Sequence, residues 1–165
     1  MATFDELLES NQTYAQDFNS GELSAPPKRK VAVVTCMDAR LHPAEFLGLD
    51  LGDAHVIRNA GGRVTEDAVR SLVISQRMLG TEEVIVIQHT DCGMMSASDE
   101  DIAEKVKEDL GVETSMEFLT FTDLKENVRH DVNRLRNTSL IPDGVPIVGA
   151  IYDVESGKVE EVTRV

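Results

Sequence analysis

Short apolar runs that stop abruptly at polar residues constrain the fold of this chain more than any other feature. Each run leads directly into a residue with metal-binding or hydrogen-bonding chemistry: Val31 to Thr35 into Cys36, Ala54 to Ile57 into Arg58, and Val84 to Gln88 into His89. Runs of this length and composition are typical of β-strands. Helical patterns lie between them, and strands that alternate with helices indicate an α/β domain built on a mainly parallel sheet.

Helix caps and apolar spacing support this organisation. Three helices are indicated by Thr65 followed by Ala68, Val69 and Leu72, by Ser98 and Asp101 followed by Ile102, Val106 and Leu110, and by Leu124, Val128, Val132 and Leu135. Near the end, residues 145–154 form an apolar strand pattern, residues 155–158 a tight turn, and residues 159–165 the alternation of an exposed edge strand. We therefore expect a central sheet flanked by helices, with an antiparallel C-terminal edge strand.

The first 30 residues predict a helical arm and a linker within a single domain of residues 1–165. Thr3 and Glu6 have the spacing of a capping box, and Pro26-Pro27 lies in the linker that leads to the first strand. Two interpretations of the arm remain open at this point. It packs on a neighbouring subunit, or it folds back on its own domain.

The charge of the chain narrows the classes of partner. Lys and Arg number 16 and Asp and Glu number 30, which gives a formal net charge of −14. Such a surface repels phosphate backbones and anionic membranes, so we expect no nucleic-acid partner and no membrane partner. The first residues lack the features of a signal peptide, and no apolar run is long enough to cross a bilayer, so we expect a cytoplasmic protein.

The two cysteines and one of the histidines carry the clearest chemical signal. Cys36 and the pair His89-x-x-Cys92 supply two thiols and an imidazole, a ligand set that suits Zn²⁺ and leaves one position open. In a sheet with strand order 2-1-3, the first and third strands lie side by side, so Cys36 and His89 should meet at their carboxyl ends. Each cysteine taken alone is more often a small buried residue. A redox pair of the Cys-x-x-Cys type is absent from the sequence.

An open position on zinc implies catalysis, since the metal lowers the pKa of its water from about 15.7 to about 7 and supplies hydroxide. Asp38 stands two residues beyond a predicted ligand, where its carboxylate can orient this nucleophile, and Arg40 can hold the carboxylate ionised through a forked contact. Without a metal nearby, the same pair would be read as a simple loop salt bridge.

The motifs Cys36-Met37-Asp38-Ala39-Arg40, Arg58-Asn59-Ala60-Gly61 and His89-Thr90-Asp91-Cys92-Gly93-Met94 resemble those of β-class carbonic anhydrases, in particular the compact archaeal and bacterial type. The resemblance implies zinc bound by Cys36, His89 and Cys92, a catalytic dyad of Asp38 and Arg40, and reversible hydration of carbon dioxide to bicarbonate by attack of zinc-bound hydroxide. It also implies a homodimer or a dimer of dimers, in which the N-terminal helix embraces the partner. In similar enzymes the aspartate can swing onto zinc and give an inactive form.

Alternatives to this function remain. Closely similar proteins hydrolyse carbon disulfide or carbonyl sulfide at the same zinc site, and a non-catalytic protein could use zinc only to stabilise its fold or its dimer. Residues Arg58, Asn59, Gly61 and Gly62 form either an anion site at a helix N-terminus or a tight turn. Gln88 stands where many relatives have glycine, a change expected to bear on pocket polarity and not on the ligand set.

Overall fold

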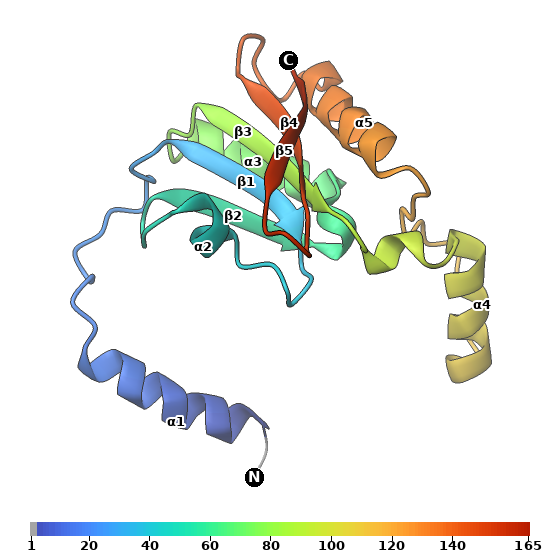
Figure 1. Cartoon of the computed structure of the whole chain (residues 1–165), viewed down its shortest axis with the longest axis horizontal. Coiled ribbons are helices and arrows are strands. Elements are labelled where there is room, and N and C mark those ends of the chain that lie inside the picture. The colour runs from blue at the N-terminus through green and yellow to red at the C-terminus, as the bar shows by residue number, and fades with distance from the viewer. Residues whose placement is uncertain (1–2) are drawn as a thin grey trace.

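The computed structural model describes residues 3–165 and contains a five-stranded sheet in the order β2-β1-β3-β4-β5 (Figure 1). The strands are β1 (Val31–Cys36), β2 (Ala54–Asn59), β3 (Glu83–His89), β4 (Ile147–Tyr152) and β5 (Val159–Arg164). The first four run parallel to their neighbours, and β5 runs antiparallel to β4. The predicted α/β fold with an antiparallel edge strand is therefore confirmed, as is the predicted order of the first three strands.

Helices cover the two faces of the sheet unequally. On one face, α3 (Glu66–Arg77) packs on β1 and β2, and α5 (Leu124–Asn137) packs on β3, β4 and β5. Their apolar side chains form one cluster with Ala32 and Val34, which are alternate residues of β1. On the other face, Val33 contacts the short helix α2 (Pro43–Leu47) through its apolar side chains. The connections that follow β1 and β3 thus leave toward opposite faces, which opens a crevice at the carboxyl ends of these two strands.

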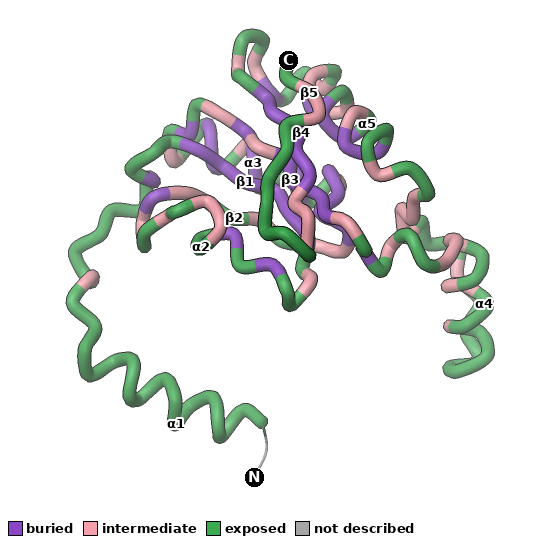
Figure 2. The backbone as a smooth tube through the Cα atoms, viewed as in Figure 1, coloured by how far each residue is buried: buried purple, intermediate pink, exposed green. Residues whose placement is uncertain are grey.

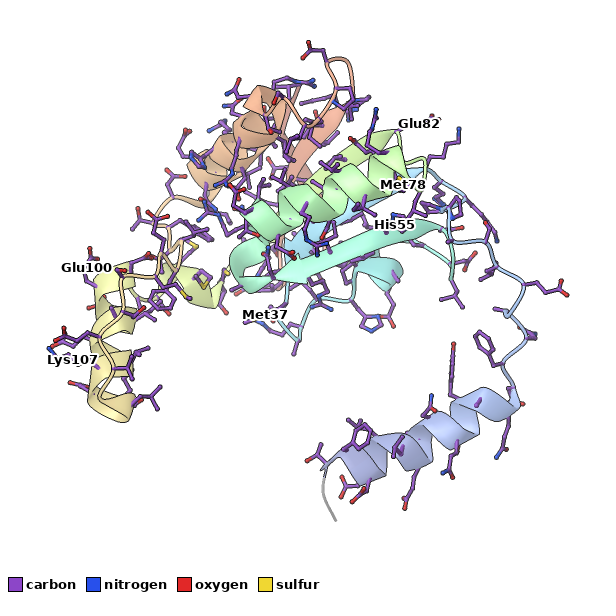
Figure 3. All side chains as sticks on the ribbon, turned by 180° about the vertical axis from the view of Figure 1, so that it is seen from behind. Met37, His55, Met78, Glu82, Glu100 and Lys107 are labelled. Carbon is purple, nitrogen blue, oxygen red and sulfur yellow. The ribbon has the colours of Figure 1, made fainter. Side chains whose placement is uncertain are left out.

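Two helices stand apart from the sheet, α1 (Thr3–Gln16) and α4 (Asp99–Leu110) (Figure 1). Neither has a buried residue, and both are exposed along their length, apart from the partly covered side of α4 (Figure 2). The view from behind shows Glu100 and Lys107 on α4 far from the strands (Figure 3). In this chain the arm does not fold back on its own domain, so that interpretation is wrong.

Local signals set the helix boundaries. The Thr65 hydroxyl accepts a hydrogen bond from the Ala68 N–H, and Ser98 with Asp101 forms the expected capping box at the start of α4. Gly111 ends α4 with a φ of 68°, in the left-handed region that glycine adopts readily. Between the helices, η1 (Ala60–Gly62) and η2 (Gly93–Met95) are single 3₁₀ turns beside the carboxyl edge of the sheet. Across residues 3–165, no helix is long and apolar enough to span a membrane.

Candidate metal centre

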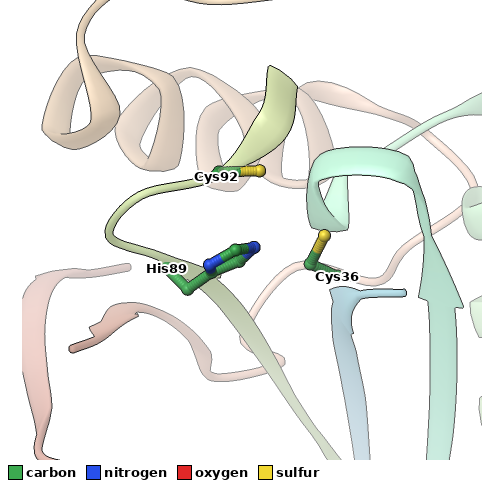
Figure 4. A group of neighbouring side chains, drawn as sticks. All are labelled: Cys36, His89 and Cys92. Carbon is green, nitrogen blue, oxygen red and sulfur yellow. The ribbon is translucent and has the colours of Figure 1, made fainter. Parts of the chain in front are cut away.

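The three predicted ligands converge at the carboxyl edge of the sheet (Figure 4). Cys36 ends β1 and His89 ends the adjacent β3, while Cys92 lies in the turn that leads into η2. Their candidate ligand atoms all lie within 4.8 Å of one another, and the residues are only 4%, 0% and 5% exposed. Within residues 3–165 no other group of histidine, cysteine and carboxylate side chains meets this description. The convergence expected from strand order is therefore present.

The orientation of the His89 ring leaves one nitrogen available. Nδ1 lies 2.8 Å from the Thr90 carbonyl oxygen. A carbonyl can only accept a hydrogen bond, so Nδ1 carries the proton and Nε2 keeps a free lone pair. Nε2 is buried and has no hydrogen-bond partner in the described chain. A buried polar atom without a partner is costly, and a metal ion at this position would satisfy it.

The two thiols differ in their surroundings. The pKa of Cys36 is lowered to about 4, chiefly because the Cys92 thiol donates a hydrogen bond to its sulfur; backbone N–H groups of Asp38 and Gly61 assist. The pKa of Cys92 is raised because it shares that hydrogen bond and is buried beside the Cys36 charge. Burial opposes protonation of His89, but its interaction with Cys36 raises its pKa overall. Cys36 is therefore the thiol that loses its proton first, and a divalent cation bound here would displace the thiol proton of Cys92 as well.

This donor set fits zinc. Two thiolates and one neutral imidazole are soft and borderline donors of the kind that zinc prefers, and three protein ligands leave a fourth tetrahedral position for water or substrate. The unpartnered Nε2 and the two free cysteines agree with that requirement. The cluster can thus hold a metal ion and still bind a reactant.

Asp38 and Arg40 form a forked ion pair beside the cluster. Arg40 donates from Nε to Asp38 Oδ1 at 3.0 Å and from Nη2 to Asp38 Oδ2 at 2.8 Å, and its backbone N–H adds a third hydrogen bond. Asp38 Oδ2 lies 3.8 Å from His89 Nε2. These contacts hold the pKa of Asp38 well below its usual range and raise that of Arg40. The carboxylate is therefore ionised throughout the neutral range and lies next to the ligand cluster.

Asp91 fixes the other side of Arg40. Its carboxylate accepts from Arg40 Nη1 at 2.6 Å, and its carbonyl accepts from Arg40 Nη2 at 2.8 Å. Asp91 itself has a φ of 52°, which turns the loop between His89 and Cys92. Asp91 therefore fixes this loop through its hydrogen bonds with Arg40.

The turn of Arg58, Gly61 and Gly62 braces the site. Arg58 donates from Nε to the Cys36 carbonyl at 3.0 Å and from Nη2 to the Asp38 carbonyl at 2.7 Å. A Cβ atom at Gly62 would lie 2.9 Å from the Cys36 nitrogen, so only glycine permits this approach. These contacts favour one of the two interpretations, a tight turn, and disfavour the other, an anion site. The Arg58 guanidinium is already engaged with backbone carbonyls.

A buried polar network behind the site was missed by sequence reasoning. Gln88 is fully buried and donates to Asp131 Oδ2 at 3.0 Å, and Arg63 donates from Nε to the same oxygen at 2.8 Å. Gln88 therefore engages the interior beneath α5 and has no exposed surface to alter pocket polarity. One signal could have revealed the network: Asp131 interrupts the apolar side of α5, between Val128 and Leu135.

Apolar side chains line the cysteine side of the cluster. Buried Leu41 packs with Cys36 and Cys92, and partly buried Phe46, Met94, Phe121, Tyr152 and Val154 pack against them. Little of either cysteine is thus exposed to solvent, and the surface next to the ligands is suited to an uncharged, apolar reactant.

Comparisons with known proteins agree with this site. The carbonic anhydrase family profile matches residues 31–159. β-Carbonic anhydrase 1 of Mycobacterium tuberculosis is 41% identical over 163 residues, which cover 99% of each chain. A carbon disulfide hydrolase of Saccharolobus solfataricus is 36% identical and covers 94% of this chain and 89% of its own. The crystal structure of a carbonic anhydrase from Streptococcus mutans superposes with a TM-score of 0.96 at 51% identity, covering 99% of both chains.

Proposed function

The chain belongs to the β-carbonic anhydrase family, and from this premise we propose that it hydrates carbon dioxide reversibly to bicarbonate at a zinc ion held by Cys36, His89 and Cys92. One observation carries the proposal. Three buried donor atoms lie within 4.8 Å of one another, and the Asp38 carboxylate lies 3.8 Å from His89 Nε2. A purely structural zinc site has no need of an ionised carboxylate beside its ligands.

Zinc, when bound here, would acidify water from a pKa of about 15.7 to about 7 and so supply hydroxide at neutral pH. The residues of the chain would hold the metal and fix the orientation of its ligands. His89 would bind through Nε2, since the Thr90 carbonyl holds the proton on Nδ1. Backbone N–H groups of Asp38 and Gly61 would share the charge of the Cys36 sulfur. These contacts would fix the ligands before the reactant arrives.

Asp38 would orient the attacking water. An ionised carboxylate only accepts hydrogen bonds, so Asp38 would hold an O–H group and turn the oxygen lone pair toward carbon dioxide. Arg40 occupies both carboxylate oxygens through its fork and is itself held by Asp91. Asp38 therefore has one orientation in this structure, with Oδ2 directed to the cluster. Carbon dioxide, which is apolar, would bind against the apolar side chains beside Cys36 and Cys92, among them Phe121.

Stopped-flow measurement of carbon dioxide hydration tests this proposal. Asp38→Ala, compared with the unmodified protein at equal zinc content, should lower kcat/KM by about 10²-fold or more, as for loss of an orienting group. Asp67→Ala removes another Asp–Arg pair, with Arg70 on α3, whose two side chains are 73% and 70% exposed, and should leave the rate unchanged. Equal rates for Asp38→Ala and the unmodified protein would contradict the assigned role of Asp38.

Metal content tests the ligands separately. Elemental analysis of the purified protein should give about one zinc per chain, and Cys92→Ala should lose it together with the activity. Retention of stoichiometric zinc and full activity by Cys92→Ala would remove Cys92 from the proposed ligand set.

Carbon disulfide hydrolysis is a second candidate activity, favoured by relatives that carry that name at 36% and 38% identity. Carbon disulfide has the same linear shape as carbon dioxide, and the same nucleophile would attack its carbon. Release of hydrogen sulfide, measured beside carbon dioxide hydration on one zinc-loaded preparation, distinguishes the two substrates.

We also propose that the chain acts as a homodimer, or as a dimer of dimers, in which α1 packs on the partner. The support lies in α1 itself, where Phe4, Leu7 and Tyr14 are 66%, 60% and 59% exposed. Exposed apolar side chains at this density on one helix mark a surface that another surface covers. The cytoplasmic location remains a prediction from the sequence.

A further inference from the structure

Asp131 is a buried carboxylate with an unusual number of partners. It is 1% exposed, and it accepts hydrogen bonds from Arg63 Nε at 2.8 Å, Arg63 Nη2 at 3.2 Å, the Val64 N–H at 3.2 Å and Gln88 Nε2 at 3.0 Å. His130 Nδ1 lies 3.4 Å from Oδ1 and is the solvent-exposed neighbour of this group. The carboxylate is therefore satisfied within the fold and touches none of the metal-site residues.

Arg63 connects Asp131 to residues 119–121, the segment that packs beside the two cysteines. With Nε and Nη2 on Asp131, its Nη1 donates to the Leu119 carbonyl, and its guanidinium lies 5.7 Å from the centre of the Phe121 ring. Leu119 has a φ of 61°, a backbone conformation that a leucine adopts only when its surroundings impose it. Arg63 is one such constraint, and a second is Asp99, which accepts the Leu119 N–H at 3.3 Å.

Phe121 is the point at which this segment reaches the site. Its N–H donates to the Met94 carbonyl at 3.2 Å, and its ring packs on the group formed by Cys36, Leu41 and Cys92. A Cβ atom at Gly61 would lie 3.3 Å from the Phe121 ring, so the ring also rests on the turn whose N–H contacts the Cys36 sulfur. A shift of residues 119–121 would therefore move the apolar wall beside both sulfur atoms.

Gln88 provides a second connection between Asp131 and the metal site. It precedes His89 on β3, is fully buried, donates to Asp131 Oδ2 and accepts from Asn127 Nδ2 at 2.8 Å. Both partners belong to α5. One carboxylate on α5 thus holds the residue before the histidine and, through Arg63, the wall beside the cysteines.

Stability alone is a weak reason for this arrangement. Two buried charges lose their hydration, and a buried ion pair often contributes no more than an apolar pair of similar size. What the ion pair adds is a fixed relative position of segments that are distant in sequence, since a forked arginine–carboxylate contact permits few orientations.

We propose that Asp131 is a positioning residue for the hydration of carbon dioxide: through Arg63 and Gln88 it sets the position of Phe121 and of the strand end that carries His89. The proposal rests on the proposed function. Asp131 acts at a distance through these side chains and contacts neither the metal ligands nor the reactant.

The test compares Asp131→Asn with Asp53→Asn. Asp53 is also a buried carboxylate paired with an arginine, Arg29, at 3.0 Å, but it lies in the loop before β2 at the opposite end of the strand from the site. Each protein is studied with zinc for kcat and KM, and with cobalt in place of zinc for the visible absorption of the metal. Both variants should lower Tm. Only Asp131→Asn should shift the cobalt bands and lower kcat/KM, by about tenfold or more, because small displacements near a reaction centre are costly.

A double variant identifies the route. If Asp131 acts through Phe121, then adding Asp131→Asn to Phe121→Ala should lower kcat/KM much less than it does in the unmodified protein. Full additivity of the two losses would overturn this route. If Asp131→Asn fails to fold, Arg63→Lys keeps the buried cation and loses the fork, and it should shift the cobalt bands in the same way.

The outcomes separate this proposal from the proposed function. A cobalt spectrum and kcat/KM unchanged in a folded Asp131→Asn or Arg63→Lys, well below Tm, would show that the network only stabilises the fold. Absence of carbon dioxide hydration in the unmodified zinc protein would instead contradict the proposed function, and the cobalt spectra would still report whether Asp131 positions the ligands.

Discussion

The carboxyl edge of the sheet and the two outlying helices, α1 and α4, differ in how far their own chain buries them. At the edge, Cys36, His89 and Cys92 are almost completely buried by their own chain, whereas α1 and α4 have no buried residue at all (Figure 2). Both regions have strong local sequence signals for their secondary structure. The difference is that residues of the same chain cover the three metal-ligand side chains, whereas they cover few or none of the side chains of α1 and α4.

This contrast separates the part of the chain that its own residues bury from the part that the proposed dimer would cover. β1 is buried on both faces, so its residues have no freedom to move independently of β2 and β3. The apolar side of α1 faces solvent in a single chain, and a lone 14-residue helix is only marginally stable in water. Changes at the edge should therefore affect folding and the site, and changes in α1 should affect assembly.

The largest effect is expected at the crowded edge itself. In Gly62→Ala the new Cβ would meet backbone atoms of Thr35 and Cys36 at 3.0 and 2.9 Å, and the φ of +63° adds strain. We expect a loss of about 3 kcal/mol in the free energy of unfolding, measured in urea. Gly48→Ala is the matched control, since Gly48 has a φ of +61° with nothing within 4 Å, and it should cost about 1 kcal/mol. Equal losses would mean that crowding at the edge is unimportant.

The next effect concerns α1. Leu7→Glu places a charge on the apolar side of the arm, where Leu7 is 60% exposed in the single chain. Burial of a leucine contributes about 1.5 to 3 kcal/mol, so the dimer dissociation constant should rise by about tenfold or more. Analytical ultracentrifugation over a dilution series measures this. Thr13→Glu puts the same charge on the opposite side of α1 and should leave assembly unchanged; dimers of equal affinity in both variants would remove α1 from the interface.

A smaller effect on stability is expected at the start of α4, where Asp99 contacts residues 118–120. Asp99 accepts from the Thr120 hydroxyl and from the N–H groups of Phe118, Leu119 and Thr120, which lowers its pKa from 3.8 to about 2. Because this pKa is depressed in the folded state, the stabilisation is fully present above about pH 3.8 and is lost as the pH falls through about 2.

Asp99→Asn should therefore be less stable than the unmodified protein at pH 6, and the gap should narrow below pH 3.8. Urea unfolding of both proteins, in the presence of a chelator so that metal loss does not contribute, measures the gap. Glu100→Gln changes the exposed neighbouring carboxylate and serves as the control. A gap that is constant from pH 6 to pH 2.5 would refute the role assigned to the Asp99 charge.

The smallest effect is expected at the start of α4. Ser98→Ala removes the capping box that Ser98 forms with Asp101, at a cost of about 1 kcal/mol. Since α4 buries nothing, this loss should appear as gradual fraying of helix by circular dichroism before the main unfolding transition. Ser115→Ala, at an exposed position, provides the comparison. A lowered main transition in Ser98→Ala would show that α4 is coupled to the sheet more strongly than its burial indicates.

Features read over a few residues could be predicted, as could the meeting of strand ends that follows from strand order. Side-chain pairs between distant segments could not. The Thr65 cap and the Ser98 capping box each involve residues three apart, and the apolar run of β1 indicates its burial directly. Arg63 and Asp131 are 68 residues apart, and Arg40 and Asp91 are 51 apart. No periodicity or cap relates such residues, because their contact depends on how α5 crosses the sheet and how the ligand loop turns.

By itself, the sequence determined the donor types and their positions at strand ends: two thiols and an imidazole beside Asp38, on strands whose parallel order brings them together. The tertiary structure alone decided which charged groups meet. It engaged Arg58 with backbone carbonyls, paired Asp91 with Arg40, and buried Asp131 beneath the site. The physical reason is that strand and helix patterns follow from local backbone preference and apolar spacing, whereas a buried charge is tolerated only where the assembled fold supplies its partners.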